Sequence, residues 1–424
     1  MAYLQTLVEN PQSFIFRRAS IQRRSATTGK YDGVWKDITN YVKSWGTMDL
    51  SIDDIEFNRF TDKGVNLTVN NDAGAFNHQS NASSFWFGYL GRYRTMLRLE
   101  AGYYDTDMST EYPSTPTMGI FILDQEISLQ SGSNEVYLRA SSLKSIFDEV
   151  QATDLASEIY NTTMTASQII TKIRDHSDGS GNMIFREFIT STSWTINATT
   201  NNYVVMTNTA NNLSVWDLMD KLAEAEGYVI LVTRTGGIEF RSRVARQGSS
   251  QFSFSGQNFP RPTVIEINDY KESWDKYFNY FKLQYLQGDT TSSYVNSGTL
   301  TSIGISNASW LFGSRQYQFQ NFFPSDTATA QAIVNNLFSL SSNIPVDVTF
   351  DAVFVPGLDV LDRIELSYRS YDLGATSIWD VMVWDRDKWG VDGVNFDFNS
   401  TAAFLTSIKI DLDSLKVNFT ARLI

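Results

Sequence analysis

The feature of this sequence that most constrains its fold is a set of three short stretches that occurs twice, in the same order. The first set is Val65–Asn70, Arg98–Tyr103 and Ile127–Ser131 continuing into Val136–Arg139; the second is Val346–Asp351, Arg363–Tyr368 and Ile410–Ser414 continuing into Val417–Arg422. Every stretch alternates apolar and polar residues, which is the period of a strand with one buried face. Chance likeness among alternating strands is the competing explanation, but three stretches in one order favour a duplication. We therefore expect two similar β modules with a different region between them.

The composition is typical of a folded protein, not of a disordered chain or a membrane protein. Hydrophobic residues make up 42% of the 424 residues and charged residues 19%, so the chain can bury the cores of two to four domains. No apolar run reaches the roughly 18 residues of a membrane-spanning helix. The start, Met1–Val8, lacks the basic and apolar segments of a signal peptide, which predicts synthesis in a cytoplasm.

Cysteine content and net charge exclude several classes of function. The chain has no cysteine, which rules out disulfides, thiolate catalysis and Cys-ligated metal centres. The net charge of −13 argues against a dedicated nucleic-acid binder, because such a protein needs a basic face. An acidic surface near DNA would repel it rather than hold it.

The hydrophobic period changes to a helical one in the middle of the chain. Thr165–Gln168 is a capping box that opens a short helix, and Ser214–Asp217 opens a second helix that Gly227 closes. Tyr228–Thr233 and Ile238–Arg243 follow as a hairpin, and Asp326–Leu340 has the apolar stripe of a further helix.

These patterns predict a mainly β protein with a small α/β insert, in which two similar antiparallel β-barrel domains flank middle modules. The expected domains are residues 1–145 (first barrel), 146–258 (α/β module), 259–343 (strands and a helix) and 344–424 (second barrel, able to pair with strands of the middle region).

Few residues suggest metal or phosphate chemistry. His78 and His176 are the only histidines, and both lie in polar surroundings typical of surface residues. Asp105–Ser109 and Asp385–Trp389 resemble the start of a calcium loop, but Pro116 and Phe396 stand where the last acidic ligand belongs, so we favour solvated loops. The Gly-rich Asp178–Asn182 lacks the Lys-Ser/Thr of a phosphate cradle.

Carboxylate pairs and tryptophans leave a sugar-active protein as the enzymatic alternative. Asp53–Asp54 or Glu224 with Glu226 could form a glycosidase pair, but any acidic chain contains such pairs. A sugar groove could be lined by Trp86, Trp379, Trp384 and Trp389. Aromatic residues in a β protein more often fill a core or an interface. We therefore predict no catalytic, cofactor-binding or metal-binding residues, no cofactor and no enzymatic activity.

Three regions of the chain resemble a known family. They are similar to the baseplate or tail hub family of long-tailed bacteriophages, which shares its fold with the N-terminal part of tail-associated lysins. The three regions are Trp35–Val42 with Ser51–Asp53 and Phe57, Arg98–Tyr103 with Met118–Ile122, and Leu222–Val229 with Gly237–Phe240. The chain stops where a lysin continues into a lytic domain, so no attached lytic activity is expected.

The resemblance implies a structural protein of the virion. Such hubs are homotrimers in which each chain contributes two similar barrels, so that a quasi-sixfold ring closes the sixfold tail tube and links it to a threefold tail tip. The implied neighbours are a distal tail protein or tail tube ring, a tape measure protein, and a central fibre or spike, with DNA passing through unbound during host entry. The alternatives are another tail-tip adaptor, such as a distal tail or tube-like protein, or a carbohydrate-active β protein.

Overall fold

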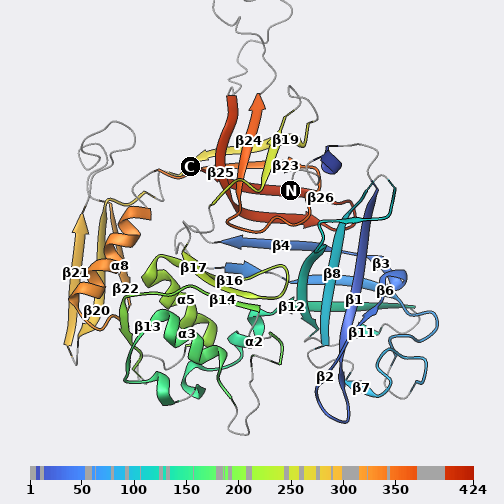
Figure 1. Cartoon of the computed structure of the whole chain (residues 1–424), viewed down its shortest axis with the longest axis horizontal. Coiled ribbons are helices and arrows are strands. Elements are labelled where there is room, and N and C mark those ends of the chain that lie inside the picture. Colours follow the sequence, from blue (N-terminus) through green and yellow to red (C-terminus); the bar gives the residue numbers. More distant parts are fainter. Residues whose placement is uncertain are drawn as a thin grey trace, which may run out of the picture.

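The computed structural model (Figure 1) describes most of the chain. The described residues are 6–9, 14–52, 60–62, 64–77, 81–90, 95–105, 107–123, 128–129, 134–155, 157–177, 185, 187–189, 193–206, 213–242, 248–256, 262–273, 277–287, 290–297, 315–321, 323–340, 344–369 and 397–424.

The first sheet is a mostly antiparallel, ten-stranded sheet built from the N-terminal part of the chain. Its main path is β2 (Tyr31–Asp37), β1 (Ile15–Ser25), β8 (Thr95–Tyr104), β10 (Thr117–Leu123), β12 (Glu135–Ser142), β6 (Val65–Asn70) and β3 (Val42–Ser44). The short strands β7 (Tyr89–Leu90), β9 (Glu111–Tyr112) and β11 (Ser128–Leu129) pair with β1, β8 and β12. In Figure 1, β1 and β8 run steeply while β6 and β3 lie across the view, so the sheet curls.

The second sheet has eight strands and draws them from three parts of the chain. Its main path is β18 (Phe252–Ser255), β24 (Arg363–Arg369), β25 (Asp397–Asp411), β26 (Lys416–Leu423), β23 (Val346–Ala352) and β19 (Val264–Glu272). Two further strands, β4 (Thr47–Ile52) and β5 (Phe60–Asp62), come from the N-terminal region, and β4 pairs with β25. The middle region supplies β18 and β19, as the sequence allowed.

The two sheets follow the same strand path, which confirms the duplication predicted from the repeated stretches. The order β6-β12-β10-β8 in the first sheet matches β23-β26-β25-β24 in the second, and the chain visits the strands in the same sequence. Leu67 lies opposite Leu138, and Val348 lies opposite Ala421. The structure therefore matches Leu138 with Ala421, and Arg139 with Arg422, the last residues of the two repeated stretches.

The strand that pairs with the outer side of β8 or β24 differs between the two sheets. β1 is antiparallel to β8, whereas β18 is parallel to β24. The chain reaches β18 from the middle region, and this entry from a distant segment allows a parallel pairing that a hairpin could not make.

The middle region holds the helices, as the change of period predicted. α3 (Ala166–Arg174) begins at the Thr165 capping box, and α5 (Val215–Glu226) runs from the Ser214 capping box to Gly227, whose φ is 66°. These helices pack with α2 (Lys144–Asp148) beside a sheet of β14 (Trp194–Ile196), β17 (Ile238–Ser242) and β16 (Tyr228–Val232), while β13 (Thr163–Thr165) pairs with β15 (Asn202–Val204).

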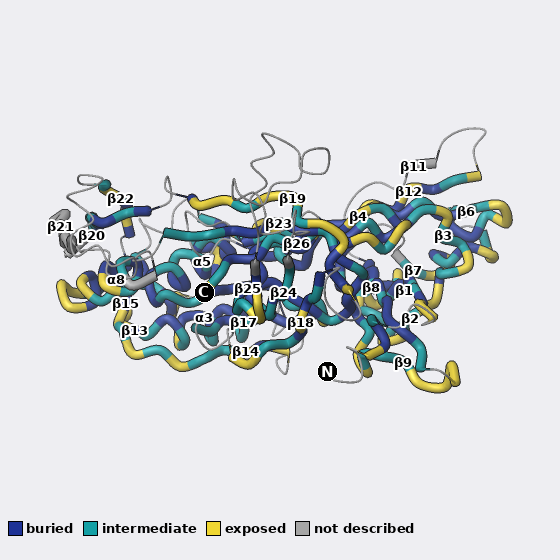
Figure 2. The backbone as a smooth tube through the Cα atoms, turned by 90° about the horizontal axis from the view of Figure 1, so that it is seen from above, coloured by how far each residue is buried: buried dark blue, intermediate teal, exposed yellow. Residues whose placement is uncertain are grey.

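A separate sheet with its own helix lies between β19 and β23 in the sequence. It consists of β21 (Thr290–Ser297), β20 (Tyr280–Gln287) and β22 (Gln316–Gln320), packed on α8 (Thr327–Leu340). Both views place this sheet at one end of an elongated molecule and the first sheet at the other end (Figures 1 and 2). The fold is therefore mainly β with a helical middle, as predicted. Short one-turn 3-10 helices lie at Thr39–Tyr41, Ala152–Asp154 and Ser157–Ile159.

Candidate functional site

The best-defined site of this protein is the junction at which the two sheets are held together. The strand β4 leaves the first sheet after β3 and pairs with the second sheet, from Thr47 opposite Asp411 to Ser51 opposite Ser407. At its far side, Phe60 on β5 is 1% exposed and lies against Trp216 of α5, with ring centroids 6.4 Å apart. This β4–β5 hairpin thus joins the first sheet, the second sheet and the middle region.

Two glycines form the exit and the return of the hairpin. Gly46 and Gly64 have φ angles of 67° and 74°, a left-handed conformation that side chains rarely adopt. A β-carbon at Gly46 would lie 2.3 Å from the carbonyl oxygen of Asn66, and one at Gly64 would lie 2.2 Å from that of Ala140. The chain can leave and rejoin the first sheet here only because these two positions lack a side chain.

The turn between β25 and β26 docks against the first sheet through one arginine and one aspartate. The Arg17 guanidinium donates to the carbonyl oxygens of Leu412 (2.6 Å) and Asp413 (2.9 Å). The Asp413 carboxylate accepts hydrogen bonds from the Ser44 hydroxyl (2.7 Å) and the Trp45 backbone N–H (2.9 Å). Hydrogen bonds that involve a charged group are stronger than neutral ones, so the hydrogen bonds of Arg17 and those of Asp413 together fix the position of the turn.

A second group of contacts lies where the loop after β23 meets the first sheet. The Tyr103 hydroxyl donates to the carbonyl oxygen of Phe354 at 2.7 Å, and Tyr103 is 4% exposed. The Arg234 guanidinium, in the β16–β17 turn, donates to the carbonyl oxygens of Thr117 (2.9 Å) and Thr115 (3.1 Å). The Tyr103 contact joins the two sheets directly, and Arg234 ties the middle region to the first sheet.

Asp62, at the end of β5, is the most perturbed carboxyl group of the junction. Burial raises the pKa of Asp62 to about 6, and the neighbouring carboxylates of Asp359 and Asp49 act in the same direction. Hydrogen bonds from the Gly64 N–H (2.8 Å) and from Ser142 lower the pKa but do not offset the burial. The junction therefore contains a carboxyl group that takes up a proton in mildly acidic solution.

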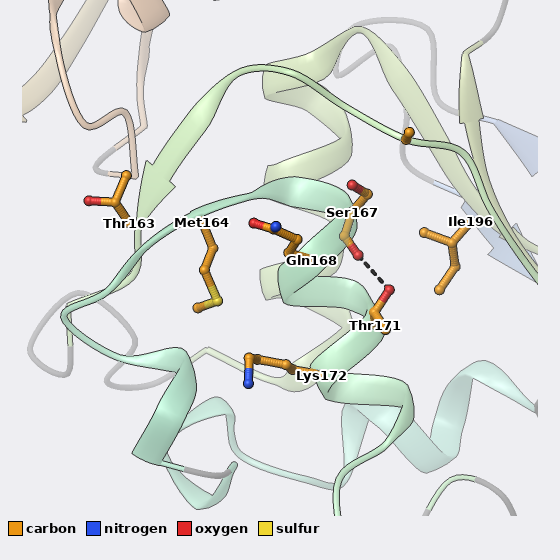
Figure 3. Close-up of a pocket in the computed structure, with 8 residues that line it drawn as sticks. Thr163, Met164, Ser167, Gln168, Thr171, Lys172 and Ile196 are labelled. Atoms are coloured by element: carbon orange, nitrogen blue, oxygen red, sulfur yellow. Dashed lines mark hydrogen bonds between the residues drawn. The ribbon is translucent and has the colours of Figure 1, made fainter.

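An open depression of about 690 Å³ lies along α3, away from the junction (Figure 3). It is lined by Thr163, Met164, Ser167, Gln168, Thr171, Lys172, Ile196 and Ala198. Ser167 exchanges hydrogen bonds with Thr199, its backbone oxygen accepts from the Thr171 hydroxyl at 2.7 Å, and Lys172 pairs with Glu158. The side chains that line it carry hydroxyl, amide, ammonium and apolar groups.

One of the two histidines differs from the sequence prediction. His176 follows the end of α3 and is 8% exposed, so the expected surface residue is in fact buried. Its neighbours Asp175 and Ser177 are only half-buried, so the burial is specific to His176, which the local sequence does not indicate. His78 lies outside the described residues.

The Asp105 loop is a self-contained turn. The Asp105 carboxylate accepts from the backbone N–H groups of Ser109 (2.7 Å) and Thr110 (3.0 Å) and from the Ser109 hydroxyl (2.9 Å). These hydrogen bonds lower its pKa. The carboxylate thus closes its own loop, as the solvated-loop interpretation expects. Asp385–Trp389 and Asp178–Asn182 lie outside the described residues. In the parts of the chain that the structure describes, no group of three or more His, Asp or Glu residues could hold a metal ion.

The carboxylate pair on α5 does not form a glycosidase arrangement. Residues two apart on a helix project from nearly opposite sides, and only Glu226 is buried, at 8% exposure. Burial raises the pKa of Glu226, while the hydrogen bond from the Asn201 amide, at 3.0 Å, acts against it. Trp86 is 2% exposed and packs near Phe76, which is the expected core role. Asp53–Asp54, Trp379, Trp384 and Trp389 lie outside the described residues.

Sequence reasoning missed the residues that build the junction. Gly64 directly precedes the first repeated stretch and Asp413 lies inside the last one. The sequence around them does not indicate which residues they contact. Arg17 contacts residues almost 400 positions away, and such a pairing leaves no local signal.

Comparison with solved structures identifies the fold. The tail protein from Neisseria meningitidis MC58 aligns with a TM-score of 0.52 over 96% of this chain and 96% of that chain, at 10% sequence identity. The 43 kDa tail protein of prophage MuSo2 from Shewanella oneidensis aligns over 96% of this chain and 98% of that chain, with a TM-score of 0.49 and 8% identity.

No protein-family model matches the sequence, and no curated protein matches it either. The resemblance to phage tail proteins is thus confirmed at the level of the fold.

Among the described residues, no helix is both long enough and apolar enough to cross a membrane.

Proposed function

We propose that this chain, which has the fold of a phage tail protein, is a structural tail hub of a bacteriophage virion. In this role three copies form a ring that closes the tail tube and links it to a threefold tail tip. The observation that carries the proposal is the occurrence of the same strand path twice in one chain, with the two sheets side by side.

The duplication is what a change of symmetry requires. A ring of three chains with one sheet each would offer three docking positions to a sixfold tube. Three chains with two similar sheets offer six nearly equivalent positions while keeping threefold symmetry for the tip. The junction built by Gly46, Gly64, Arg17 and Asp413 would hold the two sheets of each chain at the spacing that the ring needs.

The overall charge supports a role in DNA passage. The net charge of −13 would keep DNA from adhering to the wall of a channel, because like charges repel. The proposed neighbours are a distal tail protein or tail tube ring above, a tape measure protein, and a central fibre or spike below. The proposed location is the tail tip or baseplate, after synthesis in the cytoplasm of the bacterial host.

The hub role needs no catalytic group, and we propose that the chain is not an enzyme. The proposed modules are residues 1–145, 146–258, 259–343 and 344–424, with the β4–β5 hairpin of the first module inserted into the sheet of the last. A carbohydrate-active protein would instead need an open groove lined by aromatic side chains and an acid pair.

The test is the mass and symmetry of the purified chain. Light scattering after size exclusion should give three times the 48.0 kDa of the chain, and electron micrographs should show rings with six similar lobes around a channel. A species that stays at 48.0 kDa at concentrations up to about 100 µM, well above the Kd of stable interfaces, would refute the hub role.

A further inference from the structure

The second sheet has a long strand that is paired along both edges. One edge of β25 pairs with β26 from Ala403 to Asp411. On the other edge, β24 pairs with residues 397–404 and β4 continues the pairing from Ser407 to Asp411. The β4–β5 hairpin therefore occupies the half of this edge that β24 leaves open.

In the first sheet, β11 corresponds to the half of β25 that pairs with β4. Ser128 of β11 lies opposite Tyr137, as Ser407 lies opposite Thr420. Leu129 lies opposite Val136, as Ile408 lies opposite Phe419. Ser128–Leu129 therefore stand at the place that Ser407–Ile408 hold in the second sheet.

The two edges differ in what pairs with them. In the second sheet, Ser407 and Ile408 pair with Ser51 and Leu50 of β4. In the first sheet, none of the described strands pairs with the second edge of β11. An unpaired strand edge presents backbone donors and acceptors that can accept another strand.

The strand surface beside this edge is also more exposed than its counterpart. Arg422 and Asp347 form a buried bidentate pair in the second sheet, at 2.9 and 3.0 Å. The corresponding positions of the first sheet, Arg139 and Asn66, lie opposite each other and are exposed. Tyr137, on the same exposed face, is 42% exposed. The same position is thus covered in one sheet and open in the other.

The chain carries a counterpart of the hairpin at the opposite end of the molecule. The β4–β5 hairpin is inserted between β3 and β6, and the β20–β22 sheet is inserted between β19 and β23, the matching strands of the second sheet. The ends of this second insertion meet, since the Ser273 N–H donates to the Pro345 carbonyl at 2.9 Å. Within this insertion β20 is paired on both sides, and β21 is the outermost strand of the sheet (Figure 1).

We propose that the open edge of β11 binds the β21 edge of a second copy of this chain, in the place that β4 takes on β25. The contact is head-to-tail, since the first sheet and the β20–β22 sheet lie at opposite ends of the molecule (Figure 1), and a head-to-tail contact repeated three times closes a ring. This proposal rests on the proposed hub function and adds the strands by which neighbouring copies recognise each other.

The absence of cysteine allows a direct test by disulfide trapping in the full-length chain. Ser128→Cys is combined in turn with Thr291→Cys, Ser293→Cys and Val295→Cys, which scan alternate positions of β21. Strand neighbours lie within disulfide distance, so oxidation should give covalent dimers and trimers for at least one pair, reversed by reductant. The matched control replaces Ser128→Cys by Val34→Cys, which is 51% exposed on β2 at the other edge of the sheet, and it should give none.

A second measurement separates this inference from the hub function. Hydrogen exchange of the peptide containing Ser128 and Leu129 is followed as the chain is diluted from trimer to monomer. An edge amide that pairs between copies should exchange at least tenfold more slowly in the trimer. If trimers form but neither cross-links nor slower exchange appear at β11, the edge pairing is wrong and the hub function stands. If the chain never leaves the monomer, both are wrong.

Discussion

Replacing Gly46 by alanine should destabilise the protein far more than the same change at Gly29. The two glycines have nearly identical φ angles of 67° and 66°, so both variants carry the same cost of a left-handed side chain, about 1–2 kcal/mol. Alanine also narrows the unfolded ensemble equally in both cases. The comparison therefore isolates what the new methyl group meets.

The surroundings of the two positions decide the difference. At Gly29 no atom lies within 4 Å of the added β-carbon, whereas at Gly46 the Asn66 carbonyl oxygen lies at 2.3 Å and ordinary contact begins at 3.4 Å. The new methyl group would collide with the backbone of Asn66. The Gly46 carbonyl also accepts from the Leu412 N–H at 2.9 Å, so the backbone at Gly46 cannot move freely away from Asn66. Overpacking of this kind costs about 1–3 kcal/mol. Gly46→Ala should thus lose about 2–5 kcal/mol in total, against about 1–2 kcal/mol for Gly29→Ala.

Urea titration at one fixed protein concentration measures both changes, because assembly would otherwise alter the apparent stability. Hydrogen exchange of residues 47–52 should rise in Gly46→Ala and stay unchanged in Gly29→Ala, since only the former loosens the hairpin. Equal losses of unfolding free energy in the two variants would refute the role of Gly46 as the hairpin exit.

Three further changes probe the contacts between and within the sheets. Asp62 has a folded-state pKa of about 6, above its ordinary 3.8, so the folded state binds the extra proton and stability falls as pH rises from about 4 to 6. Asp62→Asn should match the wild type at pH 4 and exceed it by up to about 3 kcal/mol at pH 7; an unchanged difference between the two pH values would contradict this. Tyr103→Phe leaves the buried Phe354 carbonyl without its donor and should cost about 1–3 kcal/mol in urea titration, with a loss below 0.3 kcal/mol as the contrary result. Arg422→Ala leaves the Asp347 charge buried and should cost about 3–5 kcal/mol, whereas Arg139→Ala at the matching exposed position should stay within about 0.5 kcal/mol; similar losses would show that the burial of the pair has no consequence.

The buried pair and its exposed counterpart show how a duplicated sheet acquires two different surroundings. Both sheets keep an arginine at the same position of the fourth strand, but only the second sheet places an aspartate opposite it. A charged pair tolerates burial where its hydrogen bonds are bidentate, as here. The asymmetry fits a chain in which one copy of the module is covered internally while the other faces outward.

The elements of this protein could be predicted from its sequence because their signals are local. Alternation of apolar and polar residues marks each repeated strand, and the capping boxes at Thr165 and Ser214 with the left-handed Gly227 mark the helices. The duplication was also readable, because matching strands need matching periods. Even the order of the strands along the chain was implied by the order of the repeated stretches.

Only the tertiary structure decided which strands lie beside one another. The sequence places Met48–Ile52 among the strands of the first module, yet β4 pairs with β25 of the second. Alternation shows that a strand has a buried face but not whose edge it joins, since backbone hydrogen bonds are the same for every partner. The choice is made by the Gly46 and Gly64 bends and by contacts such as Arg17 with Leu412, which join residues far apart in the chain. Long-range geometry therefore turned two similar sheets into one joined body.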